Sequence, residues 1–431
     1  MKILHAVSFF PPFVGGAELY FKELSSRLEN RGHDVTVFTS NIVDLSPVKK
    51  TKLLSEVLEG VYTRRFNSYV PLSESKKQEK DQVGSLQRKV MGNLARLIKR
   101  GDKNYLIGSL SCLIRAFSIP CTPRMLPSIS SGNWDVVNAG FLPWSTPFLA
   151  SFCVKKSATP LIITPFYHMG QAYHDMYSTY MVLNRSVAIL VLTQSEKEVF
   201  IAHGIPAEKI RVVRGGIDPT RYNGANGMMF RSRHGISSDS FVALFLGTKD
   251  FEKGYHHTIL AMKEVWKSIA SAKLVTIGRK GTLKSWDDVS KAYHQYVCHV
   301  IEANSENVID LGVAQDQDVK DALDASNVLV LPSRAESFGM VYLEAGLFKK
   351  PVIGARFPAT CEMIVNGQYG YLVKFGDYRS LASHLIELAK NPKKREKIGE
   401  NWYQRVMDFY RWDTVIDRIE AIYEELVTKT R

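Results

Sequence analysis

Two glutamates close together in the sequence could bind one polyhydroxylated ligand. Glu336 and Glu344 have seven residues between them in the stretch Pro332-Ser-Arg-Ala-Glu-Ser-Phe-Gly-Met-Val-Tyr-Leu-Glu-Ala-Gly346. The pattern predicts Glu336 in a loop after a strand and Glu344 one turn into the following helix, where Leu343 is buried beside it. Because an ionised carboxylate only accepts hydrogen bonds, the two could accept from different hydroxyl groups of the same molecule.

Two lysines follow another expected strand. Lys249 and Lys253 lie in Gly247-Thr-Lys-Asp-Phe-Glu-Lys-Gly254, directly after a β-branched and aromatic run. Two ammonium groups at the end of a strand would neutralise a diphosphate. The alternative interpretation is a solvated loop with no ligand.

Two further candidates follow strands in the first half. Gly15-Gly16 opens a helix after Lys2–Phe9, so its backbone N–H groups and the helix dipole could receive a phosphate, although a plain tight turn explains the pair equally well. His168 follows Leu161–Thr164, and it could titrate near neutral pH or be a structural histidine.

The elements that must position these residues alternate between strand and helix. Amphipathic helical spacing is found at Ala17–Leu28, 254–269 and 341–348, and the last stretch, 401–426, is also helical. We predict strands at 2–9, 34–40, 135–139, 161–164, 188–193, 211–214, 241–246, 273–277, 308–311, 327–331 and 351–353. Such alternation predicts a parallel sheet covered on both faces, and ligands bind beyond the carboxyl ends of its strands.

The strand–helix pattern runs twice along the chain, with a Gly, Asn and Pro-rich joint at 215–227. The length of 431 residues favours two or three domains. We therefore predict an α/β protein of two doubly wound, Rossmann-like domains that face each other across a cleft. The expected boundaries are 1–225 and 226–407, and a C-terminal helix, 408–431, returns to the first domain.

Composition excludes several classes of protein. Apolar residues make up 45% and charged residues 23%, which is typical of globular domains and excludes wholesale disorder. The five cysteines are scattered, so they predict neither a disulfide framework nor a paired Cys zinc site, and they favour a reducing cytoplasm. The short apolar start predicts a strand rather than a signal peptide, and no run approaches the roughly 20 apolar residues of a membrane span.

Positive charge is concentrated in one segment. The net charge is +13, and residues 49–103 hold fourteen Lys and Arg against six Asp and Glu. Residues 83–117 combine helical apolar spacing with many of these cations. They predict either an amphipathic pair of helices on an anionic membrane surface or a helical hairpin with a solvated basic face.

Several motifs together resemble one enzyme family. Ser333-Arg-x-Glu-Ser-Phe-Gly-x-x-x-Leu-Glu-Ala345, followed by Lys350-Pro-Val-Ile353, is similar to the signature of retaining glycosyltransferase family 4, the group 1 glycosyl transferases of GT-B fold. Weaker matches occur in the family's order along nearly the whole chain. They are Gly15-Gly16-Ala-Glu18, Gly32-His-Asp-Val-Thr-Val37, Thr193-Gln-Ser-Glu196, Gly215-Gly-Ile-Asp218, Lys253-Gly254, Trp412 and Tyr423.

The resemblance implies a role for each candidate residue. Glu336 would contact the donor sugar's hydroxyls, Glu344 the ribose, and Lys253 the diphosphate, which Gly16 would approach from the first domain. Amides around Phe338, Gly339 and Met340 would line the sugar and phosphate, and His168 would lie beside the reacting carbon. This chain departs from the family at one position. The family usually has Arg directly after the first glycine of the lysine loop, whereas this chain has Thr248 and then Lys249, whose compact ammonium charge differs from an Arg fork.

The resemblance further implies a hexosyltransferase that retains anomeric configuration and needs no obligatory metal or other cofactor. Its donor would be a nucleotide-diphosphate sugar and its acceptor a glycan or a lipid-linked molecule, in glycan biosynthesis. We expect a cytoplasmic protein, peripheral at the membrane if 83–117 binds an anionic surface.

Three other interpretations stay open. Asp316-Gln-Asp318 has the Asp-x-Asp form of metal-dependent glycosyltransferases, but it precedes a helical pattern and fits an N-cap and first-turn acids better. A nucleotide-sugar epimerase would share the fold. A basic nucleic-acid-binding protein is a non-enzymatic alternative, although no aromatic residues interleave with the basic run and we predict no nucleic-acid partner.

Overall fold

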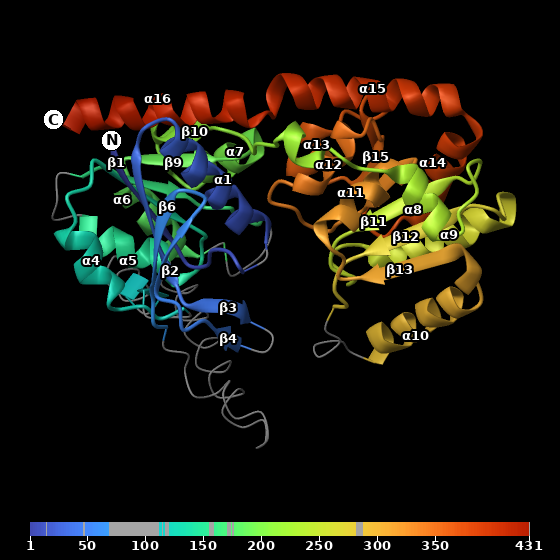
Figure 1. Ribbon diagram of the computed structural model, residues 1–431, viewed down its shortest axis with the longest axis horizontal. Helices are drawn as coiled ribbons and strands as arrows, with labels where there is room; N and C mark the ends of the chain where they lie inside the picture. Colours follow the sequence, from blue (N-terminus) through green and yellow to red (C-terminus); the bar gives the residue numbers. More distant parts are fainter. Residues whose placement is uncertain are drawn as a thin grey trace, which may run out of the picture. The chain divides into compact units, whose positions relative to one another are not determined.

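The computed structural model describes residues 1–431 except 14, 46–47, 69–111, 114, 117–119, 155–158, 170–173, 175, 282–287 and 431. The chain forms two compact units (Figure 1), of which unit 1 comprises Met1–Arg214 with Val415–Arg431 and unit 2 comprises Gly215–Thr414. The first chain passage between the units therefore lies at 214–215, where the sequence suggested 225–226. The second lies at 414–415, inside the helix expected to return.

Unit 1 is built on an eight-stranded sheet with the strand order β10-β9-β8-β7-β1-β2-β6-β5. Its strands are β1 (Lys2–Val7), β2 (Asp34–Ser40), β5 (Ser55–Leu58), β6 (Val61–Phe66), β7 (Val136–Gly140), β8 (Leu161–Thr164), β9 (Ala188–Val191) and β10 (Ile210–Val212). All residues of β7, β8 and β9 are buried, as expected of parallel strands covered on both faces.

The helices of unit 1 follow its strands in alternation. They are α1 (Gly16–Asn30), α4 (Met125–Ser131), α5 (Ser145–Cys153), α6 (Tyr177–Arg185) and α7 (Gln194–Ala202). The three-and-four spacing in α1 places Tyr20, Phe21, Leu24 and Leu28 in the core. Gly32, at φ +86, follows the end of α1 in a backbone conformation that favours glycine. The predicted helix and its end are therefore confirmed.

One edge of this sheet differs from the prediction of a wholly parallel sheet. β5 pairs with β6 in antiparallel orientation, and β3 (Ile42–Leu45) and β4 (Val48–Lys50) form a separate antiparallel pair. Glu59 and Gly60 join β5 to β6, with φ values of 49° and 85°. Two consecutive positive φ values suit a tight hairpin turn, so a short local connection replaces the helical crossover that parallel strands require.

Unit 2 has a wholly parallel six-stranded sheet in the order β13-β12-β11-β14-β15-β16. Its strands are β11 (Val242–Leu246), β12 (Lys273–Ile277), β13 (Val308–Gly312), β14 (Val328–Leu331), β15 (Val352–Ala355) and β16 (Gly370–Val373). Its helices are α8 (Gly227–Arg233), α9 (Tyr255–Ser268), α10 (Asp288–Glu302), α11 (Asp316–Ala325), α12 (Met340–Leu347), α13 (Pro358–Met363), α14 (Tyr378–Lys390) and α15 (Pro392–Phe409). The sheet is nearly as predicted, except that β16 was missed.

The C-terminal helical stretch is two helices rather than one. α15 ends at Phe409 and α16 (Trp412–Thr430) begins three residues later. Ile217 N–H donates to the Tyr410 carbonyl at 2.7 Å, and Trp412 N–H donates to the Ile217 carbonyl at 3.1 Å. This short pairing interrupts the helical hydrogen bonding, and it places the two chain passages between the units side by side.

The basic segment at 83–117 lies almost entirely outside the described residues, so its predicted amphipathic helices stay a prediction. Only 112–113 and 115–116 are described, and they are helical. In the part of the chain that the structure describes, no helix is long and apolar enough to cross a bilayer.

Candidate functional site

The loops after β11 and β14 form one packed structure in unit 2. These strands are parallel neighbours, so their carboxyl ends lie at the same edge of the sheet. Arg334 N–H donates to the Glu252 carbonyl at 2.7 Å across the two loops. A Cβ at Gly254, whose φ is +73, would lie 2.3 Å from the Pro332 carbonyl oxygen. Only glycine allows this close approach, so the packing requires glycine at position 254.

Lys253 and Glu336 meet where these loops join. The Lys253 Nζ lies 2.6 Å from Glu336 Oε1, and their side chains are 31% and 8% exposed. Asp250 Oδ1 accepts the Lys253 backbone N–H at 2.8 Å and orders the lysine loop from within. The structure therefore brings together two predicted site residues as a solvent-accessible cation beside a buried carboxylate. Such a pair can bind an anion and accept a hydroxyl hydrogen bond next to each other.

The N-terminus of α12 begins in the same loop. Gly339 precedes the helix at φ +83, and Met340 is its first residue. The Tyr342 hydroxyl donates to the Leu331 carbonyl at 2.6 Å, which holds the first turn of α12 against the end of β14. The partial positive charge of a helix N-terminus favours a phosphate or a developing negative charge.

Phe338 has a structural side chain. Its ring is 3% exposed and lies 5.9 Å from the Tyr410 ring, centroid to centroid. A Cβ at Gly215 would lie 2.4 Å from the same ring. The ring thus packs beneath the loop, and the predicted ligand contact at this position would come from the backbone.

Glu344 is half-buried on α12, where the Tyr222 hydroxyl donates a hydrogen bond to its carboxylate. Burial raises the pKa of Glu344, while Tyr222 and Arg221 oppose that rise. Arg221 also pairs with Asp316 at 3.1 Å. Neither Tyr222 nor Arg221 was a sequence candidate, because both lie in the joint more than a hundred residues before Glu344.

Lys249 is paired elsewhere. Its side chain is 3% exposed, and its ammonium group forms an ion pair with Asp310 of β13. Although partial burial of the Asp310 carboxylate acts in the opposite direction, the ion pair with Lys249 and the hydrogen bond from the Gly312 N–H, at 2.9 Å, hold the pKa of Asp310 below its usual value. The ammonium group of Lys249 is thus buried against Asp310, whereas the ammonium group of Lys253 is accessible to a ligand.

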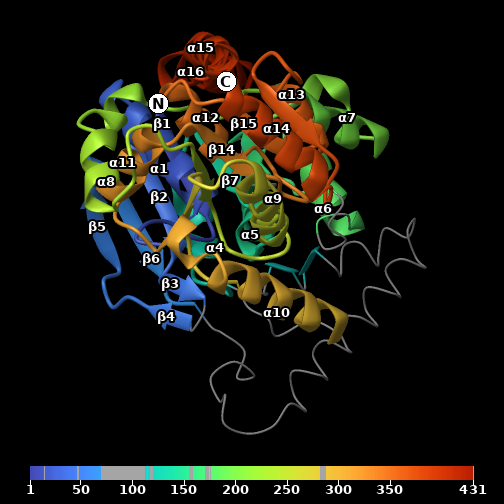
Figure 2. The ribbon, with the colours of Figure 1, turned by 90° about the vertical axis from the view of Figure 1, so that its right-hand side faces the viewer.

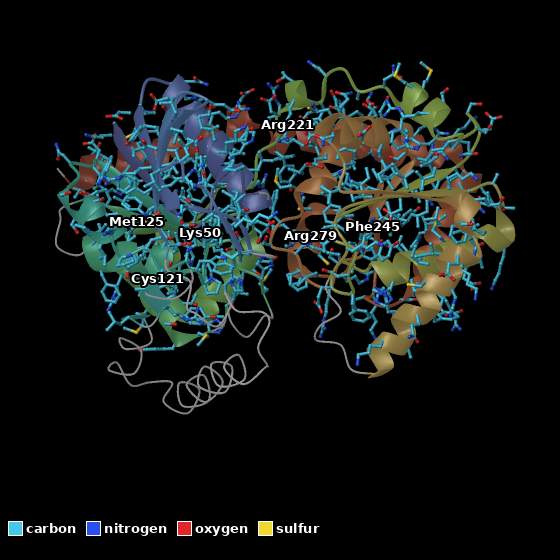
Figure 3. All side chains as sticks on the ribbon, turned by 60° about the horizontal axis from the view of Figure 1, so that its bottom comes forward. Lys50, Cys121, Met125, Arg221, Phe245 and Arg279 are labelled. Atoms are coloured by element: carbon cyan, nitrogen blue, oxygen red, sulfur yellow. The ribbon has the colours of Figure 1, made fainter. Side chains whose placement is uncertain are left out.

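The same edge of the sheet continues beyond these residues. Lys249 N–H donates to the Arg279 carbonyl at 2.9 Å, and Gly278 N–H donates to the Gly312 carbonyl at 2.7 Å. Figure 3 labels Phe245 on β11 and Arg279 after β12, and the latter side chain is exposed. The loops after β11, β12 and β13 are therefore tied to one another by backbone hydrogen bonds.

In unit 1, Gly16 is the exposed first residue of α1. Gly15 before it has extended backbone, and a Cβ there would lie 2.1 Å from a Glu18 carboxylate oxygen. Burial raises the pKa of Glu18 to about 7, although a hydrogen bond from its own backbone N–H opposes the rise. The sequence motif Gly-Gly-Ala-Glu is thus explained by a carboxylate folded back over the helix start.

His168 lies in the loop after β8, and its ring centroid is 5.2 Å from that of His174. Glu196 is 2% exposed and accepts the Tyr167 N–H at 3.2 Å with one oxygen and the Leu192 N–H at 3.0 Å with the other. The Glu196 carboxylate therefore fixes the backbone next to His168 to the end of β9. Glu196 belongs to the motif Thr193-Gln-Ser-Glu196, but the sequence alone did not predict this role for it.

The Asp-x-Asp sequence lies in the first turn of α11, after Gln315 as the N-cap. Asp316 pairs with Lys320 at 2.7 Å, and Asp318 pairs with Arg233 at 2.8 Å. First-turn acids were predicted, but the N-cap itself was misassigned. Within the described residues no cluster of three or more His, Cys, Asp or Glu side chains could hold a metal ion.

Known proteins resemble this chain in sequence. Residues 229–405 match the model of the family described as glycosyl transferases group 1. The capsular polysaccharide biosynthesis glycosyltransferase CapM of Staphylococcus aureus is 25% identical over 56% of this chain, which spans 62% of that relative's length. An uncharacterized glycosyltransferase of Methanocaldococcus jannaschii, MJ1607, is 26% identical over 70% of this chain and 78% of its own.

Solved structures share the fold. Anabaena HepE in complex with UDP and glucose superposes with a TM-score of 0.70 at 17% identity, covering 99% of this chain and 100% of that one. Sucrose-phosphate synthase from Thermosynechococcus elongatus gives a TM-score of 0.73 at 15% identity and covers both chains completely.

Proposed function

We propose that this chain, which shares the GT-B fold of the solved structures similar to it and matches the group 1 glycosyl transferase model over 229–405, is a glycosyltransferase. In this proposal it transfers a hexose from a nucleotide-diphosphate sugar to a glycan or lipid-linked acceptor with retention of anomeric configuration. The Lys253–Glu336 pair, at 2.6 Å, is the observation that carries this proposal. It offers a cation for a diphosphate and a carboxylate for sugar hydroxyls at adjacent positions. A neighbouring fold, HepE, binds UDP and glucose, which supports a nucleotide-sugar donor.

The proposed donor contacts follow the elements of unit 2. Lys253 binds the diphosphate together with amides at the start of α12, namely those of Phe338, Gly339 and Met340. Glu336 accepts hydrogen bonds from the sugar, and Glu344 accepts from the ribose. Lys249, the other predicted cation, is buried against Asp310 and would reach the diphosphate only after leaving that pair. For unit 1, the proposal keeps what the family resemblance implies, namely that Gly16 contacts the diphosphate and that His168 acts near the reacting carbon.

Charge development explains how these residues accelerate the reaction. As the bond between the sugar C1 and the diphosphate oxygen breaks, negative charge accumulates on the departing nucleotide. A fixed ammonium group and oriented amides stabilise that charge more in the transition state than in the ground state. The acceptor oxygen attacks C1 from the face that the diphosphate leaves, and its proton passes to the leaving phosphate oxygen. One C–O bond forms as another breaks, which conserves configuration and needs no obligatory metal.

A thermal-shift screen tests the donor assignment. A ligand that binds only the folded protein raises its stability, so one of the UDP-, GDP- or ADP-sugars should raise the melting temperature of the wild type. The Lys253→Ala variant should lose most of that shift, whereas Lys267→Ala, which removes an exposed cation from the far end of α9, should keep it. No shift with any of these nucleotide sugars would contradict the proposal.

Product analysis tests the reaction itself. The related proteins named as glycosyltransferases do not favour the epimerase alternative. With a genuine acceptor, NMR should show a glycoside of the donor's anomeric configuration, and a chelator should leave the rate unchanged. An inverted product would contradict retention, and an epimerised sugar formed without acceptor would restore the alternative.

The acceptor side of the proposal includes the cytoplasmic location and the contact of 83–117 with an anionic membrane. Both would suit a lipid-linked acceptor. The basic excess of the neighbouring residues supports this contact, because anionic lipid surfaces attract clustered Lys and Arg.

A further inference from the structure

Exposed apolar side chains cluster at one edge of the unit 1 sheet. Thirteen large apolar side chains are exposed among the described residues, and four of them, Leu53, Leu54, Val57 and Tyr62, lie within ten residues of sequence. Isolated exposed apolar residues are normal on soluble proteins, but a contiguous group indicates an interaction surface. Figure 2 shows β3, β4, β5 and β6, the elements around this group, on one flank of unit 1.

The hairpin geometry places two of these side chains on one face. Val57 of β5 pairs directly with Tyr62 of β6, and Ser55 pairs with Arg64. Leu53 lies two residues before β5 and is also exposed. The opposite face carries the buried Val61 and Thr63 and belongs to the core. Val57, at 68% exposure, and Tyr62, at 46%, therefore form an outward apolar strip, and the exposed Leu53, at 52%, precedes it in the chain.

Cations border this strip. The sequence before it is Lys49-Lys-Thr-Lys-Leu-Leu54, and Arg64 lies on the strip's own face beside Tyr62. Lys50 Nζ donates to the Ser68 carbonyl at 2.7 Å, a neutral acceptor that leaves the positive charge of the ammonium group in place. Lys50 is labelled in Figure 3.

The nearby acids are already neutralised in the structure. Glu56 faces the core side and pairs with the buried Arg65. Glu59 pairs with Lys22 at 2.5 Å, and Asp44 lies 3.7 Å from Lys49. Among the residues that the structure describes, the surface around the strip is therefore apolar and positively charged.

We propose that this surface, defined as Leu53, Val57, Tyr62, Lys50, Lys52 and Arg64, docks on an anionic lipid bilayer. A bilayer matches both properties together. The aliphatic side chains can enter the headgroup boundary, and the tyrosine is of the type enriched at that level. The ammonium and guanidinium groups meet lipid phosphates, and each such cation strengthens attachment about fivefold. An acidic polymer in water would match the cations alone and leave the apolar strip exposed.

The inference deepens the proposed function, because membrane docking would give the enzyme access to a lipid-linked acceptor. It rests on residues 50–64, all of which the structure describes, and not on the segment 83–117. Its readout is vesicle binding rather than turnover. The two proposals can therefore fail separately.

Vesicle co-flotation of the full chain tests the inference. The wild type should float with vesicles of phosphatidylcholine and phosphatidylglycerol, bind phosphatidylcholine alone far more weakly, and dissociate at high salt. Leu53→Ser with Val57→Ser should weaken binding at least tenfold, because two exposed aliphatic side chains no longer enter the bilayer. Lys50→Gln with Lys52→Gln should weaken it by about tenfold or more and reduce its salt dependence.

Two matched controls remove the same chemistry from unit 2. Met228→Ser with Met229→Ser replaces two exposed apolar side chains on α8, and Lys393→Gln with Lys397→Gln replaces two exposed cations on α15. Both control variants should bind as the wild type does. Circular dichroism and melting temperature verify that each variant is folded.

Four outcomes would overturn the inference. In the first, the wild type does not float with anionic vesicles. In the second, the strip variants bind as tightly as the wild type, which would assign membrane binding to another segment. Retention on dextran sulfate without vesicle binding would indicate a soluble polyanion instead. Dimerisation that depends on Val57 would indicate that the open edge of β5 pairs with a second copy of the chain.

Discussion

At the residue scale, Lys253 provides the sharpest test of the proposed chemistry. Replacing it by alanine removes the cation that would stabilise the departing diphosphate. We expect turnover at saturating donor and acceptor to fall by roughly two orders of magnitude or more, comparable with the loss of one oxyanion-stabilising donor. Lys253→Arg should recover only part of the rate, because a guanidinium fork does not reproduce a compact ammonium charge.

The control for this experiment is Lys267→Ala, since Lys267 is an exposed cation paired with Glu264 on the far end of α9. Its turnover should equal that of the wild type. Glu336→Ala should lose a similar factor to Lys253→Ala, and the double variant should lose much less than the product of the two factors if the pair acts as a unit. Wild-type turnover in Lys253→Ala would remove this residue from the mechanism.

The Lys249–Asp310 pair predicts a different response. Removing the carboxylate with Asp310→Asn leaves a buried ammonium group without its counterion, so the variant should be destabilised by roughly 1–3 kcal/mol. The double variant Lys249→Met with Asp310→Leu should be closer to the wild type, because no unpaired charge stays buried. Urea unfolding measures both. A double variant as unstable as the sum of its single variants would show that the pair does not act together.

The sequence predicted the position of Lys249 but not its ion-pair partner, Asp310. The loop sequence located Lys249 at the end of its strand, and that position is correct. Its partner lies about sixty residues later in a strand of ordinary composition, and pairing across a sheet depends on strand order. Lys253 and Glu336, by contrast, each lie in a recognisable motif directly after a buried strand.

At the element scale, the loop after β8 depends on Glu196. Its two oxygens hold the Tyr167 and Leu192 N–H groups, so Glu196→Gln replaces one acceptor by a donor and should release the loop. If His168 acts beside the reacting carbon, we expect turnover to fall about tenfold or more through lost positioning. The donor-induced thermal shift should hardly change, because the proposed donor contacts lie mainly in unit 2.

The matched control is Glu198→Gln, an equivalent change in the same helix at a residue that is not buried. A steady-state comparison should give wild-type values for this control and a fall in kcat for Glu196→Gln. Unchanged kcat in Glu196→Gln, with the protein folded, would contradict a positioning role. Loss of the donor thermal shift would instead point to a general loss of structure.

Elements were predictable where periodicity and burial agreed. The long buried runs gave the central strands of both sheets, since parallel strands need apolar residues on both faces. The β5–β6 hairpin was not predicted, because Ser55–Leu58 is short and mixed in polarity. Its turn is Glu59-Gly60, which is a weaker sequence signal for a hairpin than Asn-Gly. Strand β16 is only four residues long and starts with glycine, which weakens its local preference.

At the scale of the whole molecule, the C-terminal helix α16 is integrated into unit 1 by a buried polar network. The Tyr423 hydroxyl accepts from Asn138 Nδ2 at 2.7 Å and lies 3.3 Å from His5 Nε2. On the surface, Arg31 pairs with Asp417 at 2.6 Å. Periodicity shows that this segment is helical, but contacts between residues about four hundred positions apart are not visible in local sequence. The sequence alone therefore left the helix free to pack on either domain, and these contacts assign it to unit 1.

Both units should lose stability in acid, because each buries neutral histidines. Burial lowers the pKa of His5 to about 3 and, with nearby positive groups, that of His174 to about 3 and of His256 to about 4, from 6.5 in the unfolded chain. Below pH 6.5 the unfolded state therefore binds more protons, and each such histidine costs up to about 1.4 kcal/mol per pH unit. Glu18 acts in the opposite direction, because its pKa in the folded state is about 7. The stability that it contributes is lost as pH rises through that value, so in acid it offsets one histidine of unit 1.

Calorimetry from pH 7 downward should thus show falling melting temperatures, and His256→Asn should flatten the fall in the transition of unit 2. A transition of unit 2 equally sensitive to acid in wild type and variant would exclude His256 as the cause.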